Sequence, residues 1–220
     1  MTQRSERGPK FRRRAEARPD EVLDAALDLF IEKGFASTRV EDIAKRAGIS
    51  KGAVYLYFPS KEAILEGLVR RAILPLATHA LGFIENYEGD PRLVLTMVMK
   101  MVAGKLAEPR LLAIPKIVMR EVVHFPELAQ MYRREVLDRV MPVVEGLIRN
   151  GIDAGYLRPV DPHLTIRSLI GPVLAHVLLA EIFDIMPEDG LAIDRLIDNH
   201  LTILLDGLSA PEGGKTWSSS

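Results

Sequence analysis

The stretch spanning residues 38–61 constrains the fold most, because it encodes two short helices joined by a tight turn. Thr38 is followed three residues later by Glu41, the spacing of a capping box, so we expect the first helix to start at Thr38. Gly48 supplies the left-handed conformation that ends a helix, and Ser50 can cap the next one. That second helix is too short to be stable alone and must pack on a larger unit.

The second helix has one face that the core does not need. Val54 and Phe58 lie four residues apart and predict its buried side. The opposite side carries other residue types: Lys51, Gly52, Tyr55 and Leu56, with Tyr57 at the edge. Small domains rarely expose aromatic and aliphatic side chains together unless another surface covers them. A DNA major groove fits, because it admits a helix and offers acceptors to lysine, methyl groups to apolar side chains and phosphates to hydroxyls.

We therefore predict a DNA-binding surface of nine residues. Four are expected to contact phosphates: Arg39, Lys51, Tyr57 and Lys61. Three are expected to face base edges: Gly52, Tyr55 and Leu56. The two helix caps complete the set: Thr38 and Ser50. Replacing either lysine should weaken binding to all sequences, whereas Tyr55→Ala should mainly relax sequence preference.

The block as a whole resembles the helix-turn-helix of the TetR family of bacterial transcriptional regulators. The resemblance covers about Val22 to Leu65 and rests on three motifs: the AGxS turn at 47–50, the KGxxYxYF run at 51–58 and the SKE helix start at 60–62. Ala53 stands where the family often has threonine, and Arg39 where it often has a small hydroxyl residue. The resemblance implies a ligand-responsive regulator with a three-helix DNA-binding domain and a helical ligand-binding and dimerisation domain.

The rest of the chain predicts an all-α fold of about nine helices, because alternation with period two is nowhere sustained. Pro19 is expected in the first turn of the first helix, and Pro75 is expected to bend a long fourth helix. Further helices should start at prolines 91, 109 and 126. The expected organisation is a disordered basic arm at 1–18, a helix-turn-helix domain at 19–66, an effector-binding and dimerisation domain at 67–208 and a disordered tail at 209–220.

Positive charge is concentrated near the predicted DNA-binding surface, although the net charge of the chain is −1. Residues 1–18 hold seven basic and two acidic side chains, and residues 37–61 hold five basic and two acidic ones. Such an arm can enter the adjacent minor groove of DNA, or it can be a solvated tail without sequence preference.

The middle helices contain six of the eight methionines, at positions 97, 99, 101, 119, 131 and 141. Methionine adapts to ligands of varied shape, so we expect an apolar pocket there for a hydrophobic or amphipathic small molecule. The predicted lining, for which ordinary core packing is the alternative, is Met97, Met101, Ile117, Arg120, His124, Phe125, Met131 and Tyr132.

The last two helices carry more apolar residues than one packed face needs. We expect one face to pack on the subunit and the other on a second copy, as the corresponding helices do in the resembled family. The predicted dimer residues are Leu169, Val173, His176, Val177, Leu201 and Leu204. The alternative is that both helices are internal. A homodimer would present two recognition helices to a roughly palindromic operator in double-stranded DNA.

The sequence lacks the residues or motifs that several classes of enzyme and metalloprotein require. The absence of cysteine excludes disulfides, thiol catalysis and cysteine-bound zinc, and the histidines form no HExxH pair. No GxSxG elbow or glycine-rich phosphate loop occurs, so we predict no catalytic residue, metal or cofactor. Without a signal peptide or a long apolar run free of charges and prolines, we expect a cytoplasmic protein with no membrane segment. An enzyme or binding protein for a lipophilic molecule, with Glu121 and His124 as an acid–base pair, is the alternative.

Overall fold

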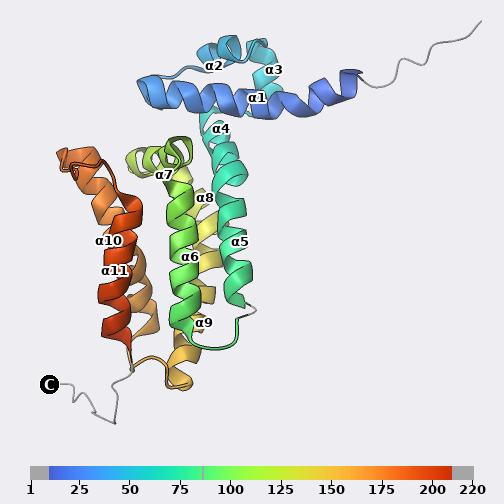
Figure 1. Ribbon diagram of the computed structural model, residues 1–220. Helices are drawn as coiled ribbons and strands as arrows, with labels where there is room; N and C mark the ends of the chain where they lie inside the picture. Colours follow the sequence, from blue (N-terminus) through green and yellow to red (C-terminus); the bar gives the residue numbers. More distant parts are fainter. Residues whose placement is uncertain (1–9, 86, 210–220) are drawn as a thin grey trace, which may run out of the picture. The chain divides into compact units, whose positions relative to one another are not determined.

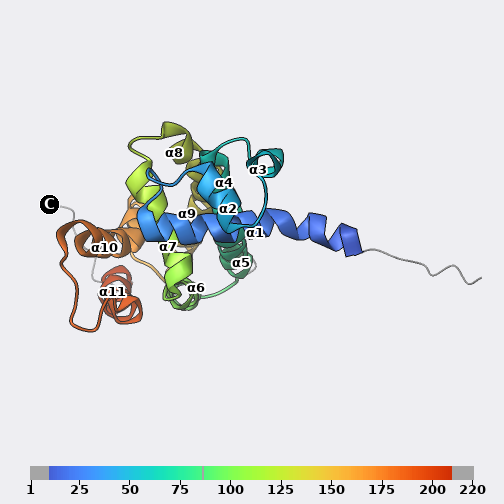
Figure 2. The same ribbon diagram turned by 90° about the horizontal axis from the view of Figure 1, so that it is seen from above.

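The computed structural model describes residues 10–85 and 87–209, and these residues form nine continuous helices (Figures 1 and 2). The elements are α1 (Lys10–Lys33), α2 (Val40–Arg46), α3 (Lys51–Tyr57), α4 (Lys61–Leu68), the π-helical turn η1 (Val69–Ile73), α5 (Leu74–Glu85), α6 (Pro91–Leu106), α7 (Pro109–Glu121), α8 (Pro126–Tyr132), the π-helical turn η2 (Arg133–Leu137), α9 (Asp138–Asp153), α10 (Pro162–Phe183) and α11 (Ile193–Leu208). The run α4–η1–α5 is one helix, and so is α8–η2–α9. The predicted all-α fold is confirmed, and so are the helix starts at prolines 91, 109 and 126.

The chain divides into two compact units. The N-terminal unit takes the described residues up to Arg71 together with Ala113–Ala129, and the C-terminal unit takes Ala72–Leu112 and the residues from Gln130 onward. The predicted boundary at residues 66 and 67 therefore lies too early, and one segment of the expected effector domain belongs to the other unit. Packing explains the exchange, because the Phe125 ring meets the buried Phe35 ring edge-on at 5.5 Å between centroids.

The core of the N-terminal unit contains apolar residues of α1, α2 and α3, with the predicted Val54 among them. The buried residues include Val22, Ala26, Leu29, Phe30, Phe35, Ile43, Ala44 and Val54. Gly34 and Gly48 end their helices at φ 84° and 68°, which side chains with a Cβ rarely adopt. A Cβ on Gly67 would lie 2.9 Å from both Leu23 Cδ2 and Phe58 Cε1, so this glycine lets α4 pack closely on its neighbours.

Two predicted helix starts were wrong. Helix α1 begins at Lys10, which places Pro19 inside it and makes residues 10–18 helical rather than disordered. Their sequence is rich in arginine, alanine and glutamate, which favour helices; residues 1–9 of the predicted arm lie outside the described residues. Helix α2 begins one residue later than a Thr38 cap requires, because the Asp42 carboxylate accepts from the Arg39 backbone N–H at 3.3 Å.

The C-terminal unit is a bundle in which α6 packs on α11 and α10 lies beside α11 (Figures 1 and 2). Its core cluster draws on α5, α6, α9, α10 and α11, and its most buried members are Val94, Leu95, Ile148, Leu157, Ile166 and Leu208. The buried His200 ring on α11 links that helix to α10 through a 3.0 Å hydrogen bond between Nε2 and the Leu169 carbonyl. Beyond Ser209, the predicted tail lies outside the described residues.

The π-helical turn η1 lies where one unit passes to the next, between Arg71 and Ala72. Pro75 lies two residues after its end and has no N–H to donate to the carbonyl of Arg71, four residues earlier. The missing hydrogen bond accounts for a widened turn at this place, and π-helical turns are often found at functional sites. The connector predicted to bend at Pro75 is a continuous helix with a π turn close to the proline, and the bend itself stays a prediction.

Candidate nucleic-acid interface

Helix α3 has the predicted buried and exposed faces. The Ser50 hydroxyl accepts from the Ala53 N–H at 3.1 Å and fixes the start of the helix. Val54 is fully buried, whereas Tyr55 is 44% and Leu56 is 83% exposed. Lys51 and Gly52 are exposed on the same helix. A face that holds a large aliphatic and an aromatic side chain in solvent beside a lysine fits a partner surface that offers apolar groups and negative charge, rather than the protein's own core.

Lys51 is positioned at the first turn of this face. Its ammonium group hydrogen-bonds the Glu41 carboxylate and lies 5.8 Å from the centroid of the Tyr55 ring. The hydrogen bond raises the pKa of Lys51 and lowers the pKa of Glu41, so both groups are charged at neutral pH. Both side chains are about half exposed. Ion pairs of this kind are weak and can exchange partners, so a phosphate can replace Glu41 as the partner of Lys51.

Two further ion pairs hold α2 on α1. Arg46 donates to both oxygens of Glu32 at 2.9 and 2.7 Å, and Lys33 donates to Asp42 at 2.6 Å. The hydrogen bond from Arg46 lowers the pKa of Glu32, and that from Lys33 lowers the pKa of Asp42. These pairs join the two helices at the surface, and Arg39, the N-cap of α2, is exposed.

Lys61 and Thr38 do not take the place that the sequence predicted for them. The Lys61 ammonium donates to the carbonyls of Phe35, Ala36 and Thr38 at 2.6, 3.2 and 3.2 Å, which uses all three of its N–H groups. It also lies 4.3 Å from the Phe35 ring centroid, and burial lowers its pKa. Thr38 is 2% exposed and donates to the Gly34 carbonyl at 2.7 Å. Both side chains hold the turn between α1 and α2.

We expect Lys61→Met to destabilise the protein by about 1 kcal/mol, because three carbonyl groups lose a charged donor at a partly exposed site. Methionine keeps the length and apolar stem of the side chain. The free energy of unfolding in urea measures the effect, with Lys45→Met on the exposed side of α2 as the control. Equal stability of the two variants would contradict the structural role of Lys61.

The structure divides the predicted effector-pocket residues between the two units. Ile117, Arg120, His124 and Phe125 belong to the N-terminal unit, and Met97, Met101, Met131 and Tyr132 to the C-terminal one. Ile117 and Met131 are buried, Met101, Phe125 and Tyr132 are half-buried, and the other three are exposed. Burial raises the pKa of Tyr132. A cavity described within the C-terminal unit is lined by none of the eight.

Three of the six predicted dimer residues are buried within their own chain. Leu169, Val177 and Leu201 are buried in their own chain, Val173 and Leu204 are half-buried, and His176 Nε2 lies 2.6 Å from the Leu191 carbonyl. Helix α10 instead exposes a different apolar stripe: Ile170, Leu174, Leu178, Leu179, Ile182 and Phe183. The surplus of apolar residues was predicted correctly, but an apolar helix does not reveal which of its stripes its own core uses.

Helix α10 is also unusually long and apolar. Within the described residues it is the one helix that is long and apolar enough to cross a bilayer, with a mean hydropathy of 1.6 over its most apolar window. Only 22% of that window is buried inside the chain. An apolar helix this exposed calls for a covering surface.

Comparison with known proteins places the helix-turn-helix and the bundle in one family. The model of bacterial regulatory proteins of the tetR family matches residues 22–68, and the model of the tetracyclin repressor-like C-terminal domain matches residues 87–198, half of the chain. The chain belongs to the TetR family. Proteins of this family bind DNA operators as dimers and respond to small-molecule effectors, and they are regulators of transcription rather than enzymes.

Individual members show how far the likeness of this TetR-family chain extends. The regulator YuxN of Bacillus subtilis is 59% identical over 44 residues, which are 20% of this chain and 15% of YuxN. The transcriptional repressor KstR2 of Rhodococcus jostii is 26% identical over 88% of this chain and 92% of its own length. The structure of SmeT, repressor of a Stenotrophomonas maltophilia multidrug efflux pump, is 28% identical with a TM-score of 0.73, covering 89% of this chain and 91% of SmeT. SmeT has also been solved in complex with triclosan.

Proposed function

We propose that this protein is a cytoplasmic repressor that binds a roughly palindromic operator as a homodimer and is released by a small hydrophobic or amphipathic effector. The observation that carries the proposal is the exposed face of α3, where Tyr55 and Leu56 stand in solvent beside the paired Lys51. A major groove accepts a helix of this kind and offers partners to all three side chains.

Within this proposal, Gly52, Tyr55 and Leu56 face base edges, and Arg39, Ser50, Lys51 and Tyr57 contact the sugar–phosphate backbone. Gly52 supports the arrangement. A Cβ built on it would meet only the Ser50 hydroxyl, at 4.0 Å, so the fold itself does not need glycine there. Its missing side chain instead lets the helix backbone approach DNA closely. Lys61 and Thr38 serve by fixing the turn that precedes α2.

The exposed stripe on α10 is the proposed dimer surface. Two copies packed through this stripe would bury side chains that one chain leaves in solvent, and a two-fold axis would relate the two α3 helices. Half-sites one or more duplex turns apart, about 34 Å per turn, would then be read together. Names of relatives such as KstR2 and SmeT support repression as the outcome.

One of the three covalent connections between the units, α7, offers a route by which an effector can act on α3. Helix α7 starts in the C-terminal unit and continues in the N-terminal unit, where Phe125 beyond its end packs on Phe35. Phe35 lies under the Lys61 ammonium, and its carbonyl accepts from that group. If α7 has two arrangements and an effector binds them with different affinity, the effector shifts the balance between them. The α1–α2 turn, which Phe125 contacts through Phe35, would then change its conformation as well. The solved complex of SmeT with triclosan supports a small-molecule effector.

Selection of bound duplexes from a random pool tests the proposal. The enriched sequences should contain an inverted repeat, and Lys51→Ala should weaken binding to all of them and flatten the salt dependence by about one ion. Lys45→Ala, which removes an exposed lysine from α2, is the matched control. Absence of an enriched sequence, together with duplex binding that does not depend on salt, would contradict the proposal.

A further inference from the structure

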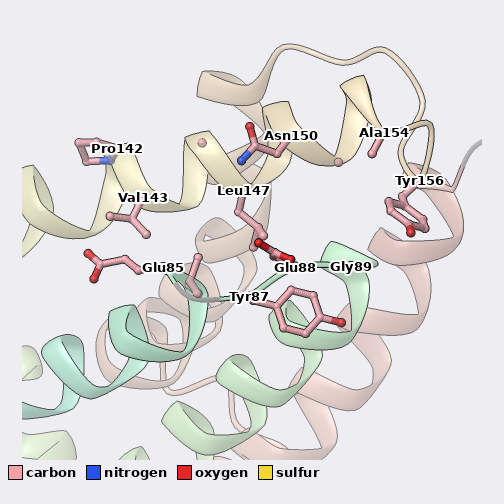
Figure 3. A pocket seen from close by; sticks show the side chains of 13 residues that line it. Glu85, Tyr87, Glu88, Gly89, Pro142, Val143, Leu147, Asn150, Ala154 and Tyr156 are labelled. Carbon is pink, nitrogen blue, oxygen red and sulfur yellow. The ribbon is translucent and has the colours of Figure 1, made fainter.

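The C-terminal unit contains a cavity that none of the predicted effector residues lines (Figure 3). It lies between the end of α5, the segment that leads to α6, and the chain from Pro142 on α9 to Tyr156 beyond that helix. Its volume is about 380 Å³, within the range of ligand pockets in proteins. The lining consists of Ile84, Glu85, Tyr87, Glu88, Gly89, Pro142, Val143, Gly146, Leu147, Asn150, Gly151, Ala154 and Tyr156.

A glycine on α9 contributes to the hollow. Gly146 lines it at a position where a larger side chain would project into the space. A Cβ on Gly146 would meet no atom within 4 Å, so this glycine faces open space rather than a packed neighbour. Figure 3 shows Val143 and Leu147 extending from the same helix toward the α5–α6 segment, where they form an apolar wall.

The cavity is electrostatically negative. Glu85 and Glu88 are exposed and line it, whereas none of its lining residues is basic. In the described part of the chain, no hydrogen bond or ion pair engages either carboxylate. Helices α5 and α9 both end here, and neither has a basic residue in its last turn. The carbonyl end of a helix carries partial negative charge, so both ends strengthen the field of the two carboxylates.

Two aromatic rings complete the lining. Tyr87 and Tyr156 border the cavity, and Tyr87 folds back over Gly89, where a Cβ would lie 3.5 Å from its hydroxyl. The face of a tyrosine ring attracts cations, and its edge packs against apolar groups. Two unpaired carboxylates, two tyrosines and an apolar wall together match a ligand with a positive charge on an aromatic or aliphatic body. We propose that this cavity binds a lipophilic organic cation, such as a quaternary or protonated amine.

Calorimetric titration of the full-length protein with benzyltrimethylammonium tests the site, with the neutral isostere neopentylbenzene as the companion ligand. We expect the cation to bind and the isostere to bind at least about tenfold more weakly. The double variant Glu85→Gln/Glu88→Gln should weaken cation binding at least about tenfold, because it removes both charges and keeps the shape. Gly146→Leu should also weaken it, by filling the hollow.

A matched control removes two exposed carboxylates elsewhere, in Glu127→Gln/Asp194→Asn, and should leave the dissociation constant unchanged. Equal affinity of the cation for the two double variants, or equal affinity of wild type for the cation and the isostere, would overturn the proposal. Operator binding in the absence of cation should be the same in Glu85→Gln/Glu88→Gln and wild type. The result of the titration therefore stands apart from the test of the DNA-binding proposal.

Discussion

A variant with Leu174 and Leu178 both replaced by glutamate is expected to be monomeric and to bind the operator at least about a hundredfold more weakly. Both leucines lie on the exposed stripe of α10, 46% and 40% exposed, so the isolated chain gains no core packing from them. Across a two-fold interface each glutamate would meet apolar groups or its own symmetry mate. Loss of the dimer removes the second α3 helix from the complex and with it the avidity of two linked half-sites.

Sedimentation and operator titration measure the two effects. Leu93→Glu is the matched control, because Leu93 is 65% exposed on α6, a helix outside the proposed dimer surface. It should leave both the mass and the affinity unchanged. A Leu174→Glu/Leu178→Glu protein that remains dimeric would show that the exposed stripe of α10 is not the interface.

Gly151→Ala is expected to lower the free energy of unfolding by about 1 to 3 kcal/mol, because the site has no room for a methyl group. A Cβ at this position would lie 2.5 Å from Pro91 Cγ and 3.0 Å from Leu157 Cδ1. The proline ring is rigid and starts α6, so α9 and α6 would have to separate. Urea unfolding at a fixed protein concentration measures the loss.

Gly146→Ala on the same helix is the control for this substitution. No atom lies within 4 Å of its added Cβ, so alanine should be neutral or stabilise α9 by up to about 1 kcal/mol through its higher helix propensity. If the two alanine variants were equally stable, the close packing at Gly151 would make no contribution to the free energy of unfolding.

Local signals predicted the helix-turn-helix well. The Ser50 cap, the left-handed Gly48 and the buried Val54 follow from neighbours within a few residues, and the structure has all three. The exposed face of α3 was predicted for the same reason, since a seven-residue helix has few ways to bury one side.

What the sequence did not reveal depends on contacts between distant residues. Lys61 lies more than twenty residues from the carbonyls that it binds, so its helix-start position suggested a phosphate contact instead. Helix α10 has two apolar stripes of similar composition, so its sequence does not show which stripe packs in the core of the chain and which stays exposed. The acidic cavity had only a weak signal in the sequence, Gly146, because a glycine in a helix leaves a cavity only where the opposite wall, here the end of α5, is known.

The position of α3 on the operator is the most direct test of the account. The chain has no cysteine, so Leu56→Cys, at a position that is 83% exposed, can carry a single iron-chelate cleavage reagent. We expect strand cleavage at two symmetric places in the operator, separated by one or more duplex turns of about 34 Å. Leu93→Cys with the same reagent is the reference. A Leu56-labelled protein that binds the operator yet cleaves it no more than the Leu93-labelled one would contradict a major-groove role for α3.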